Sequence, residues 1–183
     1  MGSFIFHETE LRGVYRIDGN PHGDHRGYFM ECYQQADFRQ AGLEYDFVQD
    51  NLSFSQKGVL RGLHFQRNHP QAKLMLVLQG AIFDVAVDLR KGSETYGQWH
   101  GEILSGENHR QLLIPRGFAH GFLVLSDTAL LRYKCDDFYH PEDEGGIVWN
   151  DPTLAVAWPD VGEVILSEKD RHFPTFRETA AEL

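Results

Sequence analysis

With 183 residues, the chain is long enough for one domain with a sizeable buried core. Its hydrophobic content of 42% and charged content of 24% are those of an ordinary globular protein. The formal net charge of −10 argues against a general nucleic-acid surface, although a few arginines can still form a positive pocket for a small anion.

Two cysteines, Cys32 and Cys135, cannot by themselves form a disulfide framework or a zinc site. The apolar start at residues 4–6 is too short for a secretory segment or a membrane span. We therefore expect free thiols in a cytoplasmic protein that makes no membrane contact.

Short apolar runs, each bounded by turn residues, predict β-strands along most of the chain. The runs cover residues 11–17, 28–33, 45–54, 74–78, 81–89, 99–104, 111–114, 121–125 and 129–133, with a turn-rich loop at 20–27. Alternation is clearest in the run 81–89, where it divides the residues into Phe83, Val85, Val87 and Leu89 on one face and Ile82, Asp84, Ala86 and Asp88 on the other. Strands at this spacing, with little helix between them, predict an antiparallel sandwich or barrel.

Two helical segments are expected. Residues 34–42 are the best candidate, because they hold Ala36 and Phe38 on a short turn that Gly42 would stop. After residue 151 the pattern becomes a Pro-interrupted tail, which we expect to pack back over the barrel, with a helical turn at 167–171.

The stretch from Val59 to Lys73 holds the first candidates for chemistry. Read as a strand, it places Leu60, Gly62, His64 and Gln66 on one face and Val59, Arg61, Leu63 and Phe65 on the other. The turn at Pro70 and the apolar run that follows predict a hairpin, which would carry Lys73 back toward His64. A base and an ammonium in one cavity could remove a proton next to a carbonyl, although a lone His and a lone Lys are more often structural or solvated.

The sequence Pro-Arg-Gly-Phe-Ala-His at 115–120 matches the second motif of the cupin jelly roll, and residues 58–73 lie where the first motif would be. Metal-binding cupins supply His-x-His and a Glu from that first motif. Here Gln66 replaces the second His, no Glu follows before Lys73, and an ammonium would repel a divalent cation. We expect a metal-free cavity, which disfavours a metal-dependent dioxygenase.

These features together predict an all-β fold, a cupin-type antiparallel jelly-roll barrel with a few short helices. The expected organisation is a single domain over 1–183, with the barrel at about 11–150 and the segment 151–183 packed on it.

Eight motifs, in order and at consistent spacing, resemble the dTDP-4-dehydrorhamnose 3,5-epimerase family. They are DHRGYFME at 24–31, FVQDN at 47–51, VLRGLHFQ at 59–66, KL at 73–74, FDVAVDLR at 83–90, IPRGFAHGF at 114–122, YK at 133–134 and WND at 149–151. Each motif alone is weak, but the combination is specific and extends from about residue 11 to 175.

The resemblance implies a dimeric, cofactor-free epimerase that inverts C3 and C5 of dTDP-4-dehydro-6-deoxy-D-glucose, giving dTDP-4-dehydro-L-rhamnose. The family's general base falls on His64, its orienting carboxylate on Asp170, its general acid on Tyr133, and the lysine beside the C4 oxygen on Lys73. Substrate contacts of the family fall on Arg26, Phe29, Glu31, Gln49, Asn51, Arg61, His120, Glu144 and Lys169. In relatives Arg26 and Glu31 reach the site of the neighbouring subunit, so the dimer would be part of the active site.

The same chemistry follows from the residue types. A 4-keto group acidifies the C–H bonds at C3 and C5, and an imidazole, which changes protonation near neutral pH, suits the base. A carboxylate can fix the imidazole tautomer, an ammonium can stabilise the enolate oxygen, and guanidinium groups can bind a diphosphate bidentately.

Several alternatives stay open at this point. Tyr133 could be a core aromatic and Asp170 a solvated helix residue, and we favour a structural buried pair for Asp84 and His120. Residues 75–79 carry no basic side chain where many relatives have one. This leaves room for a mono-epimerase that acts at C3 or C5 alone of another dTDP-4-keto-6-deoxysugar. A sugar-nucleotide-binding cupin without turnover is the rival from another class.

Overall fold

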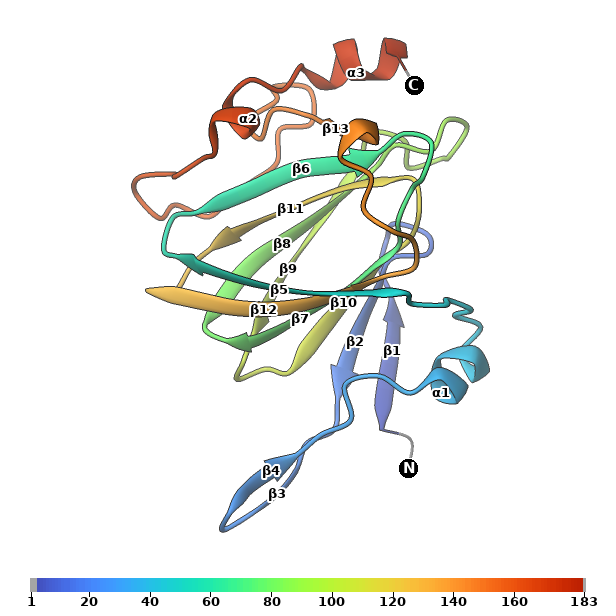
Figure 1. The fold of residues 1–183 in the computed structure, drawn as a ribbon, viewed down its shortest axis with the longest axis vertical. Helices are drawn as coiled ribbons and strands as arrows, with labels where there is room; N and C mark the ends of the chain where they lie inside the picture. Colours follow the sequence, from blue (N-terminus) through green and yellow to red (C-terminus); the bar gives the residue numbers. More distant parts are fainter. Residues whose placement is uncertain (1–2, 183) are drawn as a thin grey trace.

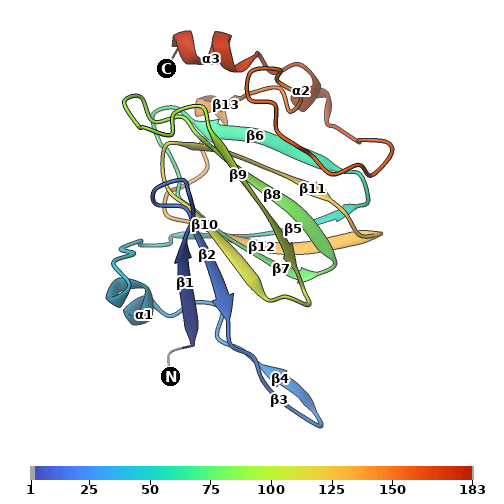
Figure 2. The ribbon, with the colours of Figure 1, turned by 180° about the vertical axis from the view of Figure 1, so that it is seen from behind.

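The computed structural model describes residues 3–182, so the outermost ends of the expected 1–183 domain lie outside it. Two antiparallel sheets face each other and enclose the interior of a barrel (Figure 1, and from behind in Figure 2). The six-stranded sheet has the order β1 (Phe4–Glu8), β2 (Tyr15–Gly19), β10 (Arg110–Ile114), β7 (Lys73–Gln79), β12 (Thr128–Cys135) and β5 (Gln49–Gln56). The five-stranded sheet has the order β13 (Glu144–Gly146), β6 (Leu60–Gln66), β11 (Phe118–Val124), β8 (Ala81–Asp88) and β9 (Trp99–Ser105). The predicted antiparallel, all-β architecture is confirmed.

Strand β8 shows why the sheets pack as they do. Ile82 and Ala86 are buried in the cluster between the sheets, whereas Val85 and Val87 belong to a second cluster on the outer face of the five-stranded sheet. The predicted alternation of this strand is confirmed. Phe176 of the C-terminal segment covers the second cluster, and burying a side chain of this size stabilises the fold by about 1.5–3 kcal/mol.

Both predicted helical segments are present. Helix α1 (Gln35–Gln40) begins where the Gln34 side chain accepts a hydrogen bond from Asp37 N, and Gly42 follows its end with a φ of +79°. Helix α2 (Glu168–Arg171) begins at Ser167, whose hydroxyl accepts from Asp170 N. The sequence reading missed the terminal helix α3 (Phe176–Glu182) and the short 3₁₀ turn at Pro141–Asp143. Within residues 3–182, no helix is long and apolar enough to cross a bilayer.

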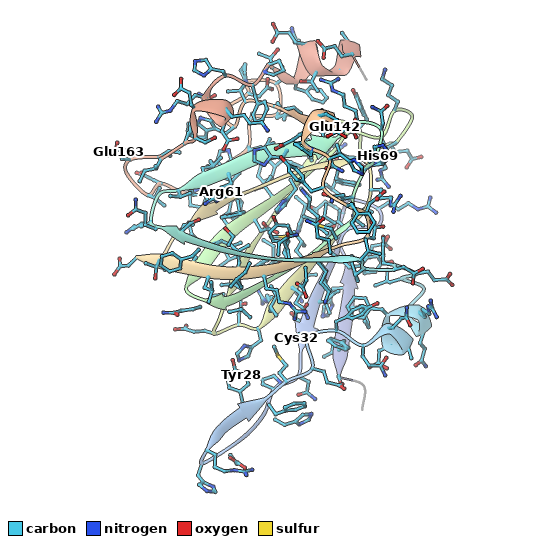
Figure 3. All side chains as sticks on the ribbon, in the orientation of Figure 1. Tyr28, Cys32, Arg61, His69, Glu142 and Glu163 are labelled. Carbon is cyan, nitrogen blue, oxygen red and sulfur yellow. The ribbon has the colours of Figure 1, made fainter. Side chains whose placement is uncertain are left out.

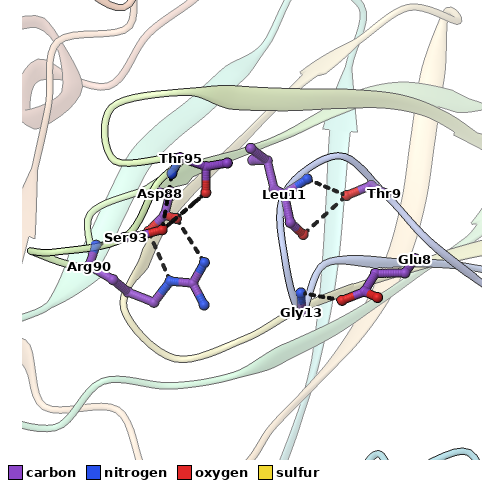
Figure 4. Close-up of polar contacts among 8 residues, drawn as sticks. All are labelled: Glu8, Thr9, Leu11, Gly13, Asp88, Arg90, Ser93 and Thr95. Carbon is purple, nitrogen blue, oxygen red and sulfur yellow. Dashed lines mark hydrogen bonds and ion pairs between the residues drawn. The ribbon is translucent and has the colours of Figure 1, made fainter.

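The N-terminal strands differ from the prediction. Strand β1 was not expected, and the run 11–17 becomes a strand only from Tyr15, because Thr9 and Gly13 take part in a turn (Figure 4). The strand predicted at 28–33 is wrong except for Tyr28 and Phe29, because no strand covers residues 30–33. Instead β3 (His22–Asp24) and β4 (Gly27–Phe29) form a small hairpin that projects from the barrel (Figure 1), because a turn at 24–27 lets them pair with each other.

The predicted hairpin after β6 is also wrong. Strand β6 pairs with β11 and β13, while β7 pairs with β10 and β12, so the connection at 67–72 crosses from one sheet to the other. The buried Asp143 holds this connection, because its carboxylate accepts hydrogen bonds from the backbone N–H groups of Asn68 and His69. Two successive strands show the same alternation of side chains whether they pair with each other or belong to different sheets. Local alternation therefore cannot distinguish a hairpin from such a crossing.

The predicted faces of β6 are correct for His64 but wrong for Arg61. The register between β6 and β11 shifts, so that His64 lies opposite His120 while Arg61 lies opposite Phe122. One extra residue on β6 therefore reverses the alternation. Gly62 makes this possible, because its φ is +132° and a Cβ there would lie 2.5 Å from the Cα of Gly121.

Candidate active site

A cavity of about 780 Å³ opens between the two sheets and is lined from both of them. Four of its lining residues carry a positive charge: Arg61, Arg67, Lys73 and Lys91. Of the residues that line it, all within 3–182, Glu144 alone has a carboxylate. Figure 3 shows Arg61 on the side of β6 that faces the opposite sheet. The cavity therefore offers an anion a positive environment on a chain whose formal net charge is −10.

His64 is held from behind by Asp170, with 2.6 Å between His64 Nε2 and Asp170 Oδ1. Burial by itself raises the pKa of Asp170, but hydrogen bonds from His64, Ser167 and the Gly62 backbone outweigh it and lower the pKa below its ordinary value. The ionised carboxylate can only accept, so Nε2 carries the hydrogen and Nδ1 is the basic nitrogen of a neutral ring. Nδ1 lies 4.0 Å from Glu144 Oε1, and Phe173 packs edge-on against the ring with centroids 5.5 Å apart.

Lys73 lies on β7, on the opposite side of the cavity from β6. Burial lowers its pKa, while Cys135, Asp84 and Glu144 act in the other direction. The two carboxylates in this group are already engaged, Asp84 with His120 and Glu144 with Lys169. The ammonium is thus available to a negatively charged ligand atom in the cavity.

Tyr133 lies on β12, next to β7, and so faces the cavity from the six-stranded sheet. Burial raises the pKa of its phenol, and the nearby Cys135 and Glu144 add to the shift. The hydroxyl therefore stays protonated at neutral pH and can donate a proton. Because His64 belongs to the five-stranded sheet, a base and a proton donor stand on opposite walls of one cavity.

His120 and Asp84 form the buried pair that the sequence reading favoured. His120 Nε2 lies 2.7 Å from Asp84 Oδ1, and both residues are buried on neighbouring strands. Burial lowers the pKa of His120, against the attraction of Asp84, which favours the neutral ring at pH 7. In the register His120 lies directly opposite His64, so this pair forms part of the cavity wall.

The other expected contact residues divide into two groups. Gln49, Asn51, Arg61 and Glu144 line the cavity, and Lys169 reaches its edge through a 2.5 Å contact between its Nζ and Glu144 Oε2.

Arg26, Phe29 and Glu31 lie on or next to the β3–β4 hairpin, away from this cavity. Arg26 is paired with Asp24, Phe29 is 71% exposed, and Glu31 accepts a hydrogen bond from Ser3. Figure 3 shows Tyr28 of the same hairpin far from Arg61.

Sequence reasoning missed Tyr139, which lines the cavity and donates from its hydroxyl to Glu144 Oε2 at 2.6 Å. This hydrogen bond to a carboxylate, with some help from burial, raises the pKa of Tyr139 to about 12. The available signal was the aromatic pair Phe138-Tyr139, which lies in the loop a few residues after the strand that carries Tyr133. Cys135 was also missed as a lining residue; it and Cys32 are free thiols, as expected.

Gln66, which occupies a metal-ligand position of other cupins, is fully engaged with the backbone. Its Nε2 donates to the carbonyls of His69 and Phe138, and its Oε1 accepts from His140 N. Across residues 3–182, no three His, Cys, Asp or Glu side chains gather as a ligand set for a metal ion.

The wall that Leu89 and Lys91 contribute to the cavity is held by a separate polar network (Figure 4). Asp88 accepts hydrogen bonds from the Arg90 guanidinium, Ser93 Oγ and Thr95 Oγ1. Arg90 in turn lies over the ring of Phe118, 4.5 Å from its centroid. The network fixes the loop after β8 beside Phe118, which also lines the cavity.

The family model for dTDP-4-dehydrorhamnose 3,5-epimerase matches residues 8–178. The chain belongs to this family. A dTDP-4-dehydrorhamnose 3,5-epimerase from Methanothermobacter thermautotrophicus is 54% identical over 180 residues, which cover 97% of each chain.

Solved structures of epimerases have the same fold. A Legionella pneumophila epimerase in complex with dTDP-4-keto-L-rhamnose has a TM-score of 0.95 at 50% identity, covering 98% of this chain and 96% of that one. A 3'-monoepimerase from Streptomyces bikiniensis in complex with dTDP-quinovose has a TM-score of 0.88 at 36% identity, covering 96% and 89%. The predicted family and cupin jelly-roll fold are confirmed.

Proposed function

We propose that this protein is an isomerase that inverts C3 and C5 of dTDP-4-dehydro-6-deoxy-D-glucose and forms dTDP-4-dehydro-L-rhamnose, for dTDP-rhamnose biosynthesis. The observation that carries the proposal is the position of His64 and Tyr133 on opposite walls of one cavity, with Lys73 on β7, the strand next to that of Tyr133. Inversion at carbon requires removal of a proton from one face and its return to the other. The names of the relatives support the same reaction.

In the proposed mechanism, His64 Nδ1 takes the proton from C3 or C5, and the C–H electron pair moves into an enolate on the C4 oxygen. Lys73 stabilises the negative charge that develops there. Tyr133 then donates its hydroxyl proton to the opposite face of the carbon, which closes the ketone again. The imidazolium and phenolate that remain exchange protons with solvent before the second centre reacts.

Asp170 acts through His64 in this proposal and is a positioning residue. It fixes the tautomer in which Nδ1 is free, and its charge stabilises the imidazolium once the proton has moved. Arg61 suits the diphosphate, because a guanidinium pairs bidentately with phosphate oxygens. Gln49, Asn51, His120, Glu144 and Lys169 are proposed as further substrate contacts.

We also propose a homodimer in which the partner's Arg26, the partner's Phe29 and the partner's Glu31 complete the site. In each subunit these residues lie outside its own cavity, on or beside the β3–β4 hairpin. Among residues 3–182, the two strands of this hairpin pair with each other and with no other strand. A two-stranded hairpin with an exposed Phe29 is marginally stable in water, so it gains from packing on a second surface.

We also propose a single domain over 1–183 and a cytoplasmic location. The single domain is supported by two contacts of the C-terminal segment with the barrel. Ile165 forms a β-bridge with Val59, and Phe176 packs in the cluster on the five-stranded sheet. The free thiols support a cytoplasmic location.

The experiment is proton NMR of dTDP-4-keto-6-deoxyglucose incubated with the protein in D₂O. We expect deuterium at both C3 and C5, and an L-rhamnose product after coupled reduction. Deuterium at one carbon would select a mono-epimerase, and no deuterium at either would indicate a binding module. The matched control is His64→Asn, which should abolish exchange at both carbons while nucleotide binding persists.

A further inference from the structure

Cys135 is the last residue of β12 and lines the cavity from the six-stranded sheet. Strand β12 lies between β5 and β7, and in the register Cys135 lies opposite Gln49 on one side and Lys73 on the other. Tyr133, two positions earlier on the same strand, lies opposite Asn51. The thiol therefore lies between two amide side chains and the ammonium of Lys73.

A directional chain of hydrogen bonds leads to this thiol. It starts at the backbone N–H of Tyr139, which can only donate, and which donates to Gln49 Oε1 at 3.0 Å. This fixes the orientation of the Gln49 amide, so that its Nε2 donates to Asn51 Oδ1 at 3.0 Å. With its oxygen engaged, Asn51 presents Nδ2 to Cys135 Sγ at 3.7 Å.

The charge state of the thiol suits this position. Burial raises the pKa of Cys135 to about 11, although Lys73 acts in the opposite direction. The thiol is therefore neutral at pH 7 and leaves the charge of Lys73 available to the cavity. Its sulfur is a weak hydrogen-bond acceptor and can accept one of the two amide hydrogens of Asn51. The other amide hydrogen is left for a second partner.

We propose that Cys135 is a positioning residue that fixes the amide of Asn51, so that its second N–H is presented to an oxygen atom of the bound sugar nucleotide. The inference rests on the proposed function, because the ligand is taken to be the dTDP-sugar. Asn51 is already among the proposed substrate contacts; the inference adds that the buried thiol sets the direction of its N–H groups. Without the sulfur, the Asn51 amide keeps only its hydrogen bond from Gln49 and can turn about that contact, which moves its N–H groups.

The test compares Cys135→Ser, which keeps an acceptor, with Cys135→Ala, which removes it. Both variants lose a similar volume, so a purely structural effect would affect them equally. With dTDP-4-keto-6-deoxyglucose we expect Cys135→Ala to raise KM about tenfold, the effect of one lost hydrogen bond to the ligand, with kcat within about twofold. Cys135→Ser should stay within about twofold of wild type in both constants.

Two further measurements make the result decisive. In an Asn51→Ala background, Cys135→Ala should cause no further loss, since the two residues act as one unit. The side-chain NH₂ signals of Asn51 in ¹⁵N-labelled protein should shift in Cys135→Ala, whether or not the protein turns over. Equal effects of Ser and Ala, additive losses with Asn51→Ala, or an unchanged Asn51 signal would overturn the inference. A wild-type protein that exchanges no deuterium would instead refute the proposed function, and the Asn51 signal would still test the positioning.

Discussion

His64 and Asp170 are 106 positions apart in the chain, yet His64 Nε2 lies 2.6 Å from Asp170 Oδ1. The contact exists because the C-terminal segment lies along the start of β6, where Ile165 exchanges backbone hydrogen bonds with Gly58 and Leu60. Ser167 then begins the short helix that carries Asp170 to the imidazole. The candidate base is thus oriented by a segment outside the two sheets.

Asp170→Asn tests whether this contact orients the base. The amide keeps the volume but can donate to Nε2, which would move the imidazole hydrogen to Nδ1 and block the basic nitrogen. We expect kcat for deuterium exchange to fall by roughly 10²- to 10⁴-fold, with KM within about twofold. Steady-state exchange by NMR measures both constants, and Asp170→Glu should recover part of the rate. An unchanged kcat in Asp170→Asn would remove the positioning role.

Tyr133→Phe separates proton removal from proton return. His64 would still take the proton, so C3 and C5 should exchange with D₂O, but without a donor on the opposite wall the carbons should keep their configuration. NMR of the recovered sugar gives deuterium content and coupling constants together. Inversion at the normal rate in Tyr133→Phe would mean that another group is the acid.

Subunit complementation tests the proposed shared site. His64→Asn and Arg26→Ala should each inactivate a homodimer. In a heterodimer of the two variants, the Arg26→Ala subunit keeps its own His64. Its site also receives an intact β3–β4 hairpin, with Arg26, from the His64→Asn subunit. Purified heterodimers with two different tags should recover about half of the wild-type rate, because one of two equivalent sites is intact. Heterodimers as inactive as both parents would show that Arg26 acts within its own subunit. An active Arg26→Ala homodimer would show that Arg26 has no part in the site.

Asp88 should make the stability depend on pH. Burial by itself raises its pKa, but hydrogen bonds from Arg90, Ser93 and Thr95 lower the pKa to about 2 (Figure 4). The pKa of Asp88 is lower in the folded state than in the unfolded state. Its ionised carboxylate therefore stabilises the fold fully at pH values above the unfolded-state pKa, and this stabilisation is lost as the pH falls through the folded-state pKa. The shift from the ordinary pKa of 3.8 to about 2 corresponds to a contribution of about 2 kcal/mol to the free energy of unfolding.

The measurement is urea unfolding of wild type and Asp88→Asn at pH 7 and near pH 3. Asp88→Asn should be less stable at pH 7, and the difference should shrink at the lower pH. A difference that stays constant between the two pH values would contradict the assignment.

The sequence by itself determined most of the barrel strands, the family and most of the predicted residues in the cavity. Strand alternation is a local property, which is why β8 could be divided into two faces before its neighbours were known. The motifs around His64, Lys73 and Tyr133 have a specific composition, so they identified the family without any geometry.

Only the tertiary structure decided how these pieces meet. The crossing of β6 to β7 between sheets, the register shift at Gly62 that turns Arg61 inward, and the contact of Asp170 with His64 all depend on residues distant in sequence. The sequence also could not predict the chain of hydrogen bonds from Tyr139 to Cys135, because this chain connects two strands and a loop. Pairing between distant strands is selected by packing of the whole barrel, and local periodicity carries no information about it.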